Sequence, residues 1–340
     1  MRRRGFVLPF VIIAIGTSGT LAMAFITAAW RGHRAGRQGR QAESVALAAD
    51  EVLADAQRAW RADSLWTLPP GTAVTRTIDL PNGVHHDIVW RRSHPLVAWL
   101  DVRSARISRI AEERAGRRRT RALWLAPPSL PLPAALTASG AVIGEGATTV
   151  SGIDIPHAAM PCGMQRDAVD VAAIVAGQVA PAAPAAWPAM PVWAVVPPTV
   201  SLQVSSALPT VVQHSVALPR DSLPAPLPAS PGWQALLLDG PVIVVQGPTV
   251  WRGLLTVRGA LRLQGPVQID GVLLVRGPLD AQRARLRVRG AVLVADSLGA
   301  DVRLGGDTDV QYDRCAVQMA LATVATPRST PFVLWQATGH

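Results

Sequence analysis

The sequence predicts an α+β protein that is mostly β, with a long amino-terminal transmembrane and amphipathic helix, a small antiparallel sheet and a short carboxy-terminal β-solenoid. Three observations lead to this fold class. Residues 6–30 carry no ionisable side chain, residues 72–127 alternate between apolar and polar side chains, and a glycine recurs at every sixth position from Gly247 to Gly277. The 29 prolines and 28 glycines argue against a helical bundle.

The apolar segment is long enough to cross a bilayer, because a spanning helix needs only about 20 apolar residues. We therefore predict a basic leader at residues 1–5 and a transmembrane helix at residues 6–30. A cleaved secretory signal is the alternative, but no convincing small-residue cleavage site follows the segment. Arginines lie on both sides of the segment, at 2–4 and at 31–40, so their asymmetry does not fix the topology.

The membrane helix is predicted to continue as an amphipathic helix at residues 31–66. Apolar side chains recur there at three- and four-residue spacing, and carboxylates are available to the solvent-facing side. The apolar positions are Val45, Ala49, Val52, Leu53, Ala56 and Trp60, and the acidic positions are Glu43, Asp50, Glu51 and Asp55. Pro69 and Pro70 end the helix, since proline lacks the amide hydrogen that a continuing helix requires.

A small antiparallel sheet is predicted at residues 72–127. The turn sequence PNG between the first two strands predicts a hairpin. The four predicted strands cover residues 72–80, 84–92, 95–103 and 117–127.

Residues 128–235 are rich in alanine and proline, and we predict that they form long surface loops. One segment within them, residues 139–156, resembles a first solenoid rung. At the other end of the chain, residues 322–340 are predicted to be a tail.

The glycine repeat lies within residues 236–321, which are predicted to form the solenoid. Between successive glycines the second and fourth residues are usually apolar, a two-residue period typical of short strands with one buried face, and glycine provides each corner. Three six-residue units close one eighteen-residue coil of a triangular β-solenoid. A curled antiparallel sheet is the alternative.

An eighteen-residue coil also predicts which residues stack on one another. The predicted pairs are Arg258 over Arg276, Leu261 over Leu279, and Arg252 over Asp270. The period slips by one residue between Gly277 and Gly290, so an irregularity or bulge is expected there.

The amino terminus is similar to that of type IV pilin-like proteins. A short basic leader, the sequence GFVLPFVIIAIG from Gly5 to Gly16, an arginine-rich hinge and an alanine-rich amphipathic helix most closely resemble PilX-type pilus-assembly proteins. The resemblance implies cleavage by a prepilin peptidase after Gly5, with Phe6 as the new amino terminus. It also implies a helix packed on a small antiparallel sheet. Phe10 stands at the fifth mature position, where many pilins carry glutamate, so ordinary polymerisation into a fibre is not implied.

Cys162 and Cys315 are the two cysteines of the sequence. In an exported domain two widely separated cysteines most simply form one disulfide, which would hold the loop region against the end of the repeat. Two buried free thiols are the alternative. The sequences PCG around Cys162 and QYDRCAVQMAL around Cys315 resemble the carboxy-terminal region of PilX-like membrane proteins.

The charge of the chain suits an anionic partner. All 33 lysine and arginine positions are arginines, and the formal net charge of +10 fits a membrane surface, a nucleic acid or an acidic polymer. The best binding candidate is an arginine face on one strand, made by Arg283, Arg285, Arg287 and Arg289. A solvated face is the favoured interpretation of this pattern, and binding of phosphate or acidic polysaccharide by the guanidinium groups is the alternative. Aromatic residues of the kind that stack on single-stranded nucleic acids are scarce around it.

No catalytic residue, cofactor or metal site is predicted. Five aspartates near the end of the repeat could act as acid and base or bind calcium, but they lie in turn-like sequence, where aspartate is common for backbone hydrogen bonding alone. They are Asp296, Asp301, Asp307, Asp309 and Asp313. His85 and His86 with Asp87 make a poor chelate, because adjacent strand residues point to opposite faces.

These observations predict a non-enzymatic, single-pass inner-membrane protein with an extracytoplasmic carboxy-terminal domain. The resemblance implies a minor or assembly component of a type IV pilus or a related secretion apparatus, with pilin-like subunits or assembly proteins as partners and a surface filament as a further location. One alternative is a membrane-tethered β-solenoid enzyme or lectin that acts on envelope polysaccharide. A second is a polymer-forming scaffold of the bactofilin kind.

Overall fold

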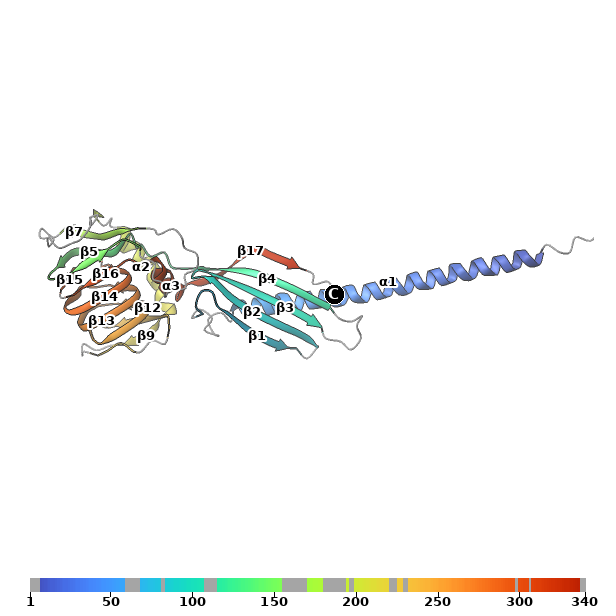
Figure 1. Ribbon diagram of the computed structural model, residues 1–340, viewed down its shortest axis with the longest axis horizontal. Coiled ribbons are helices and arrows are strands. Elements are labelled where there is room, and N and C mark those ends of the chain that lie inside the picture. The colour runs from blue at the N-terminus through green and yellow to red at the C-terminus, as the bar shows by residue number, and fades with distance from the viewer. Residues whose placement is uncertain are drawn as a thin grey trace, which may run out of the picture.

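The computed structural model describes residues 7–58, 68–80, 83–106, 115–154, 170–179, 194–195, 199–219, 225–228, 232–296, 299–305 and 307–336. Three parts follow one another along the long axis of the molecule: the projecting end of a long helix, a small sheet and a solenoid (Figure 1). The predicted fold class, mixed α and β with mostly β structure, is confirmed.

The first element is a single continuous helix, α1 (Val7–Arg58), whose 52 residues extend over about 78 Å. The predicted transmembrane and amphipathic helices are therefore one helix, and Trp60 lies outside the described residues. Towards the amino terminus its apolar side chains are exposed, as at Phe10 and Phe25. From Val45 to Ala56 the predicted apolar side is buried against the small sheet, and the four predicted acidic residues are exposed.

The small sheet has five antiparallel strands in the order β1-β2-β3-β4-β17. They are β1 (Ala73–Asp79), β2 (Val84–His94), β3 (Val97–Arg106), β4 (Ala115–Ala126) and β17 (Thr326–Gln336). The four predicted strands and their hairpin are confirmed. The predicted tail at residues 322–340 is wrong, because β17 pairs with β4. Its position at the edge of the sheet explains how a segment that contains Pro327 forms a strand, since proline cannot donate a ladder hydrogen bond.

The second sheet has twelve strands and forms a β-solenoid of about four turns. Its strands are β5 (Ala134–Gly144), β6 (Thr149–Ser151), β7 (Ala172–Val179), β8 (Ala194–Val195), β9 (Val216–Pro219), β10 (Gln234–Asp239), β11 (Val242–Gln246), β12 (Thr249–Val257), β13 (Ala260–Val275), β14 (Leu279–Val294), β15 (Val302–Leu304) and β16 (Asp309–Gln311). The neighbouring strands are parallel, which excludes the curled antiparallel alternative.

The predicted stacking is confirmed where the strands pair. Leu261 lies over Leu279, and Arg252 lies over Asp270. Arg258 and Arg276 lie just past the ends of β12 and β13. The expected irregularity is a register shift between β13 and β14.

Glycine is required at the corner where β13 turns. Gly271 has a φ of 137°, and a Cβ there would lie 2.1 Å from the carbonyl oxygen of Gly253. Gly253, Gly271 and Gly290 stack in one column, so each rung repeats the same close backbone approach. The glycine period is therefore an architectural requirement of the coil.

The segment predicted as a first rung is a rung, but it does not lie at the free end of the solenoid. β5 and β6 stack on β14, β15 and β16, and β7 and β8 continue beyond them. The helix α2 (Thr199–His214) and β9 then begin the opposite end. The predicted loops on either side of that rung are thus wrong where β7, β8, α2 and β9 form. These elements were missed in the sequence because α2 contains a proline, Pro209, and because β7 is rich in alanine, as the surrounding loops are.

A short helix, α3 (Arg314–Ala322), joins the two parts and corrects the prediction that the solenoid extends to residue 321. Asp313 caps it, since its side chain accepts a hydrogen bond from the amide of Ala316. Ala320 and Leu321 belong to the solenoid core, whereas Ala322 belongs to the core between α1 and the small sheet. One helix therefore packs into both cores.

Candidate functional site

The predicted arginine face lies on β14 as the alternation implies. Arg283, Arg285, Arg287 and Arg289 are exposed, whereas Ala284, Leu286 and Val288 between them are buried. The buried residues belong to the solenoid core, so the guanidinium groups point outward from one side of the solenoid.

Parallel stacking places other polar side chains beside these arginines. Arg287 lies between Gln268 on β13 and Asp309 on β16, and Asp309 lies next to Thr149 on β6. Arg289 lies in the same way between Asp270 on β13 and Gln311 on β16. Adjacent strands are about 4.8 Å apart, so the side chains at paired positions form closely spaced rows across the strands.

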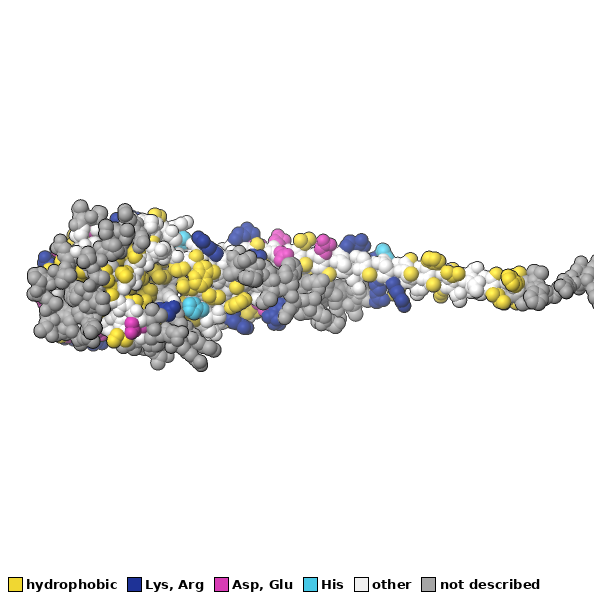
Figure 2. Space-filling view, turned by 90° about the horizontal axis from the view of Figure 1, so that it is seen from above, with side chains coloured by type: hydrophobic (Ala, Val, Ile, Leu, Met, Phe, Trp, Pro, Cys, Tyr) yellow, Lys and Arg dark blue, Asp and Glu magenta, His cyan; other side chains and the backbone are white. Residues whose placement is uncertain are grey.

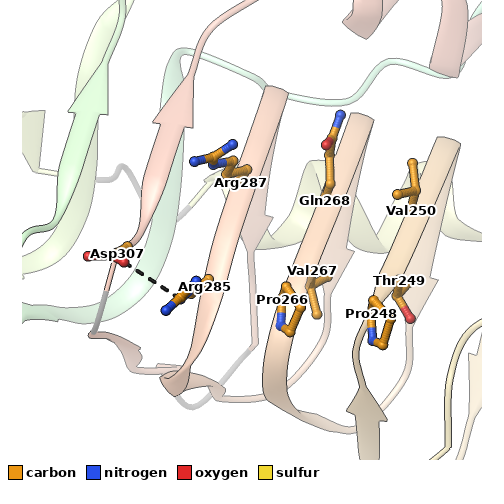
Figure 3. A pocket seen from close by; sticks show the side chains of 9 residues that line it. All are labelled: Pro248, Thr249, Val250, Pro266, Val267, Gln268, Arg285, Arg287 and Asp307. Carbon is orange, nitrogen blue, oxygen red and sulfur yellow. Dashed lines mark ion pairs between the residues drawn. The ribbon is translucent and has the colours of Figure 1, made fainter.

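Two adjoining cavities lie on this side, with volumes of about 300 Å³ and 330 Å³. They share Gln268, Arg287 and Asp307, so we treat them as one solenoid trough. Its polar lining includes Gln268, Arg285, Arg287, Arg289, Asp307 and Asp309. Figure 3 shows Val250, Gln268 and Arg287 side by side on three neighbouring strands. Arg283 does not line either cavity, so three of the four predicted arginines form the trough.

The charges in the trough are unevenly paired. Arg285 lies 3.7 Å from Asp307 through Nε and Oδ2, and Thr149 donates a hydrogen bond of 2.8 Å to Asp309. Asp270 is nearly buried, lies 3.5 Å from Arg252 and accepts a hydrogen bond from Gln268. Within the described part of the chain, Arg287 has no hydrogen-bond or ion-pair partner, although it lies in the middle of the trough. Arg289 also lines the trough and likewise has no such partner among the described residues, so both guanidinium groups are available to a ligand.

The trough partners of the arginines could not be found by reading one strand. Gln268 and Thr149 are separated from Arg287 by 19 and 138 positions in the sequence, and only the coil brings them together. The one available signal was the eighteen-residue period. One extra residue on β14, between Asp280 and Arg283, lengthens that period to nineteen before the pairing reaches Arg287.

Several of the five aspartates near the end of the repeat hold the rung of β5 and β6 in place. Asp301 accepts a hydrogen bond from the amide of Ala141, and Asp309 accepts one from Thr149. Asp313 caps α3. Asp307 lines the trough, and the amide of Asp296 donates to Ser139. The side chains of Asp301, Asp309 and Asp313 therefore serve hydrogen bonding, as interpreted from the sequence, whereas the side chain of Asp307 pairs with Arg285.

The adjacent histidines point to opposite faces of the small sheet, as predicted. His86 is buried, its Nδ1 lies 2.7 Å from the Ser104 hydroxyl, and burial lowers its pKa. His85 lies on the open face, where hydrogen bonding to Asp79 raises its pKa. No group of three or more histidine, cysteine, aspartate or glutamate side chains suited to a metal ion occurs among the described residues.

Of the remaining predicted residues, Cys315 alone lies within the described part of the chain. Gly5, Phe6 and Cys162 are outside the described residues. Cys315, at the start of α3, is disulfide-bonded, and the sequence contains one other cysteine, Cys162. The alternative of a free thiol at Cys315 is therefore excluded.

One helix, α1, is long and apolar enough to cross a membrane. Its most apolar window has a mean hydropathy of 2.0, and none of that window is buried. Comparison of the chain with family models, curated proteins and solved structures finds no match.

Proposed function

We propose that this chain is a membrane-anchored, non-enzymatic minor-pilin-like or assembly component of a type IV pilus or a related secretion apparatus. The observation that carries the proposal is the division of α1 into two halves. From Phe10 to Trp30 its large apolar side chains are exposed, and from Val45 to Ala56 one side is buried in the head of the molecule. One continuous helix thus joins an apolar anchor to a folded head.

The exposed half of α1 requires a nonaqueous neighbour. Apolar surface contributes roughly 25 cal/mol per Å² when it leaves water, and monomeric soluble proteins rarely expose long contiguous apolar surfaces. Nothing within the described residues covers this half. A bilayer meets the requirement, and a bundle of similar helices in a filament would meet it too.

Arginines follow the apolar half, as expected of a helix that leaves a bilayer. Arg34 lies 5.0 Å from the ring centroid of Trp30, and tryptophan is enriched at bilayer interfaces. About 22 Å of helix separates Trp30 from Val45, the first residue buried against the head. Figure 2 shows arginines along this stretch, between the apolar end of the helix and the head. In the proposed arrangement these arginines meet lipid headgroups.

The resemblance to pilins also bears on the role within the apparatus. Phe10 occupies the position of the glutamate found in many pilins, and its side chain is exposed. Phenylalanine cannot form a charge pair with a neighbouring helix, so the chain is better suited to a filament end or to assembly than to a repeated subunit.

Fractionation of cells that produce the full chain tests the proposal. We expect the protein in the carbonate-washed membrane pellet and, in piliated cells, in small amounts with sheared filaments. The double variant Ile13→Arg, Ile15→Arg places two charges in the apolar half, at about 2.5 to 3.5 kcal/mol each near a bilayer centre, and should leave the membrane fraction. Leu47→Arg is the control, because Leu47 is exposed on α1 outside the anchor.

Two results would contradict the proposal in different ways. A native chain recovered in the soluble fraction contradicts the anchor. A membrane-bound chain that never accompanies filaments or pilus-assembly proteins contradicts the assignment to the apparatus while leaving the anchor intact.

A further inference from the structure

We infer that the solenoid trough binds a saccharide chain that carries carboxylates. The inference rests on the trough alone and does not depend on the proposed pilus role. Each of its two cavities reaches the lower end of the volume range of small-ligand sites, which is about 300 to 1,000 Å³.

The trough is elongated across the strands of the solenoid. Its lining runs from Val250 on β12 through Gln268 and Arg287 to Asp309 on β16 and Thr149 on β6. Four steps between adjacent strands span about 19 Å. This length suits a chain of several units that lies across the strands better than it suits a single small molecule.

Arg287 is the group that would bind a carboxylate. Its guanidinium is exposed, is shared by both cavities and has no hydrogen-bond or ion-pair partner in the described part of the molecule. Arginine presents a planar fork of donors that matches a carboxylate in two parallel hydrogen bonds. Arg289 lies two residues further along the same strand and also lines the trough, so a second carboxylate can be bound nearby.

The groups around Arg287 suit sugar hydroxyls. The amides of Gln268 and Gln311 both donate and accept hydrogen bonds, and the carboxylates of Asp307 and Asp309 accept them. The side chain of Pro266 adds a small apolar surface at the other end of the trough. A molecule with many hydroxyls and an occasional negative charge satisfies this mixture.

The same mixture disfavours a nucleic acid or a polyphosphate. Asp307 and Asp309 would repel a ligand with a charge on every unit, and neither cavity is lined by an aromatic side chain on which a base could stack. A carboxylated saccharide is thus the class of ligand that fits both the charges and the shape.

Isothermal titration calorimetry on the full chain in detergent tests the inference, with a hyaluronan oligosaccharide, which carries a carboxylate on every second sugar, as the probe and a neutral malto-oligosaccharide of similar length as its comparison. We expect saturable binding of the acidic oligomer alone. Arg287→Ala should weaken that binding at least about tenfold, because the hydrogen bonds of a charged group are lost. Arg262→Ala is the matched control, since Arg262 is also exposed, on β13, but lies outside the trough, and it should change the affinity less than about twofold.

Several outcomes overturn the inference. They are no binding of the acidic oligomer, equal binding of the neutral one, tighter binding of single-stranded DNA, or equal weakening by both arginine variants. Gln268→Ala provides a second measurement, with a smaller loss expected because a neutral side chain is removed. All these outcomes leave the membrane fractionation unchanged, so failure of the trough inference can be distinguished from failure of the proposed function.

Discussion

Single residues at the corners of the solenoid have no room for a side chain. Gly271→Ala would place a methyl group 2.1 Å from the backbone oxygen of Gly253, at a φ that side chains rarely adopt. We expect a loss of at least about 3 kcal/mol in the free energy of unfolding, measured by denaturant titration of the full chain in detergent. Gly232→Ala is the control, because nothing lies within 4 Å of the added atom. Equal stability of the two variants would contradict the stacked glycine column.

His86 makes the stability of the small sheet depend on pH. Burial lowers its folded pKa below 6.5, so the unfolded chain binds protons first and stability falls as the pH drops below that value. His94, whose pKa burial also lowers, acts in the same direction, and His85, whose pKa is raised, acts in the opposite one.

His86→Gln should therefore flatten the fall of the melting temperature between about pH 7.5 and pH 5.5. His85→Gln is the comparison and should steepen that fall, because a raised folded pKa stabilises the folded protein at low pH. A native slope in the His86 variant would show that the ring is not held neutral in the folded protein.

At the scale of elements, α1 contacts the sheet through an ion pair with a buried arginine as well as through apolar packing. The side chain of Arg119 on β4 is 2% exposed, and its Nε lies 3.0 Å from Oδ1 of Asp50 on α1. Its Nη2 donates a further hydrogen bond to Oδ2 of the same carboxylate. The helix register on the sheet is thus fixed by a specific pair.

Asp50→Asn should lower the free energy of unfolding by about 1 to 2 kcal/mol, because a buried guanidinium loses its charged partner. The matched variant is Asp55→Asn, whose partner Arg58 is exposed, and its effect should stay below about 0.5 kcal/mol. Chemical denaturation of both variants decides the matter, and a larger loss at Asp55 would contradict the account of the interface.

The elements that could be predicted from the sequence are those whose pattern is local. The helix α1 and strands β1 to β4 follow from apolar spacing within each segment, and the coil follows from the glycine period. β17 could not be predicted, because it is stabilised by β4, which lies some 200 positions earlier in the chain. Of the trough, the sequence predicted only the arginines of one strand. Gln268 lies beside Arg287 because β13 pairs with β14, and Thr149 lies near them because β6 stacks on β16.

At the scale of the whole molecule, three structural parts follow one another along one axis. The apolar half of α1 forms one end, the helix-backed sheet lies in the middle, and the solenoid with its trough forms the other end (Figure 1). Because α3 packs into both cores, the sheet and the solenoid are joined by buried contacts as well as by the chain.

The central proposal is that the chain is a processed, pilin-like membrane protein. Mass spectrometry of the amino-terminal peptide, from protein recovered in the membrane fraction of cells with a prepilin peptidase, tests it most directly. The account predicts a mature chain that begins at Phe6, after removal of residues 1–5. A membrane-bound chain that retains Met1 would contradict it.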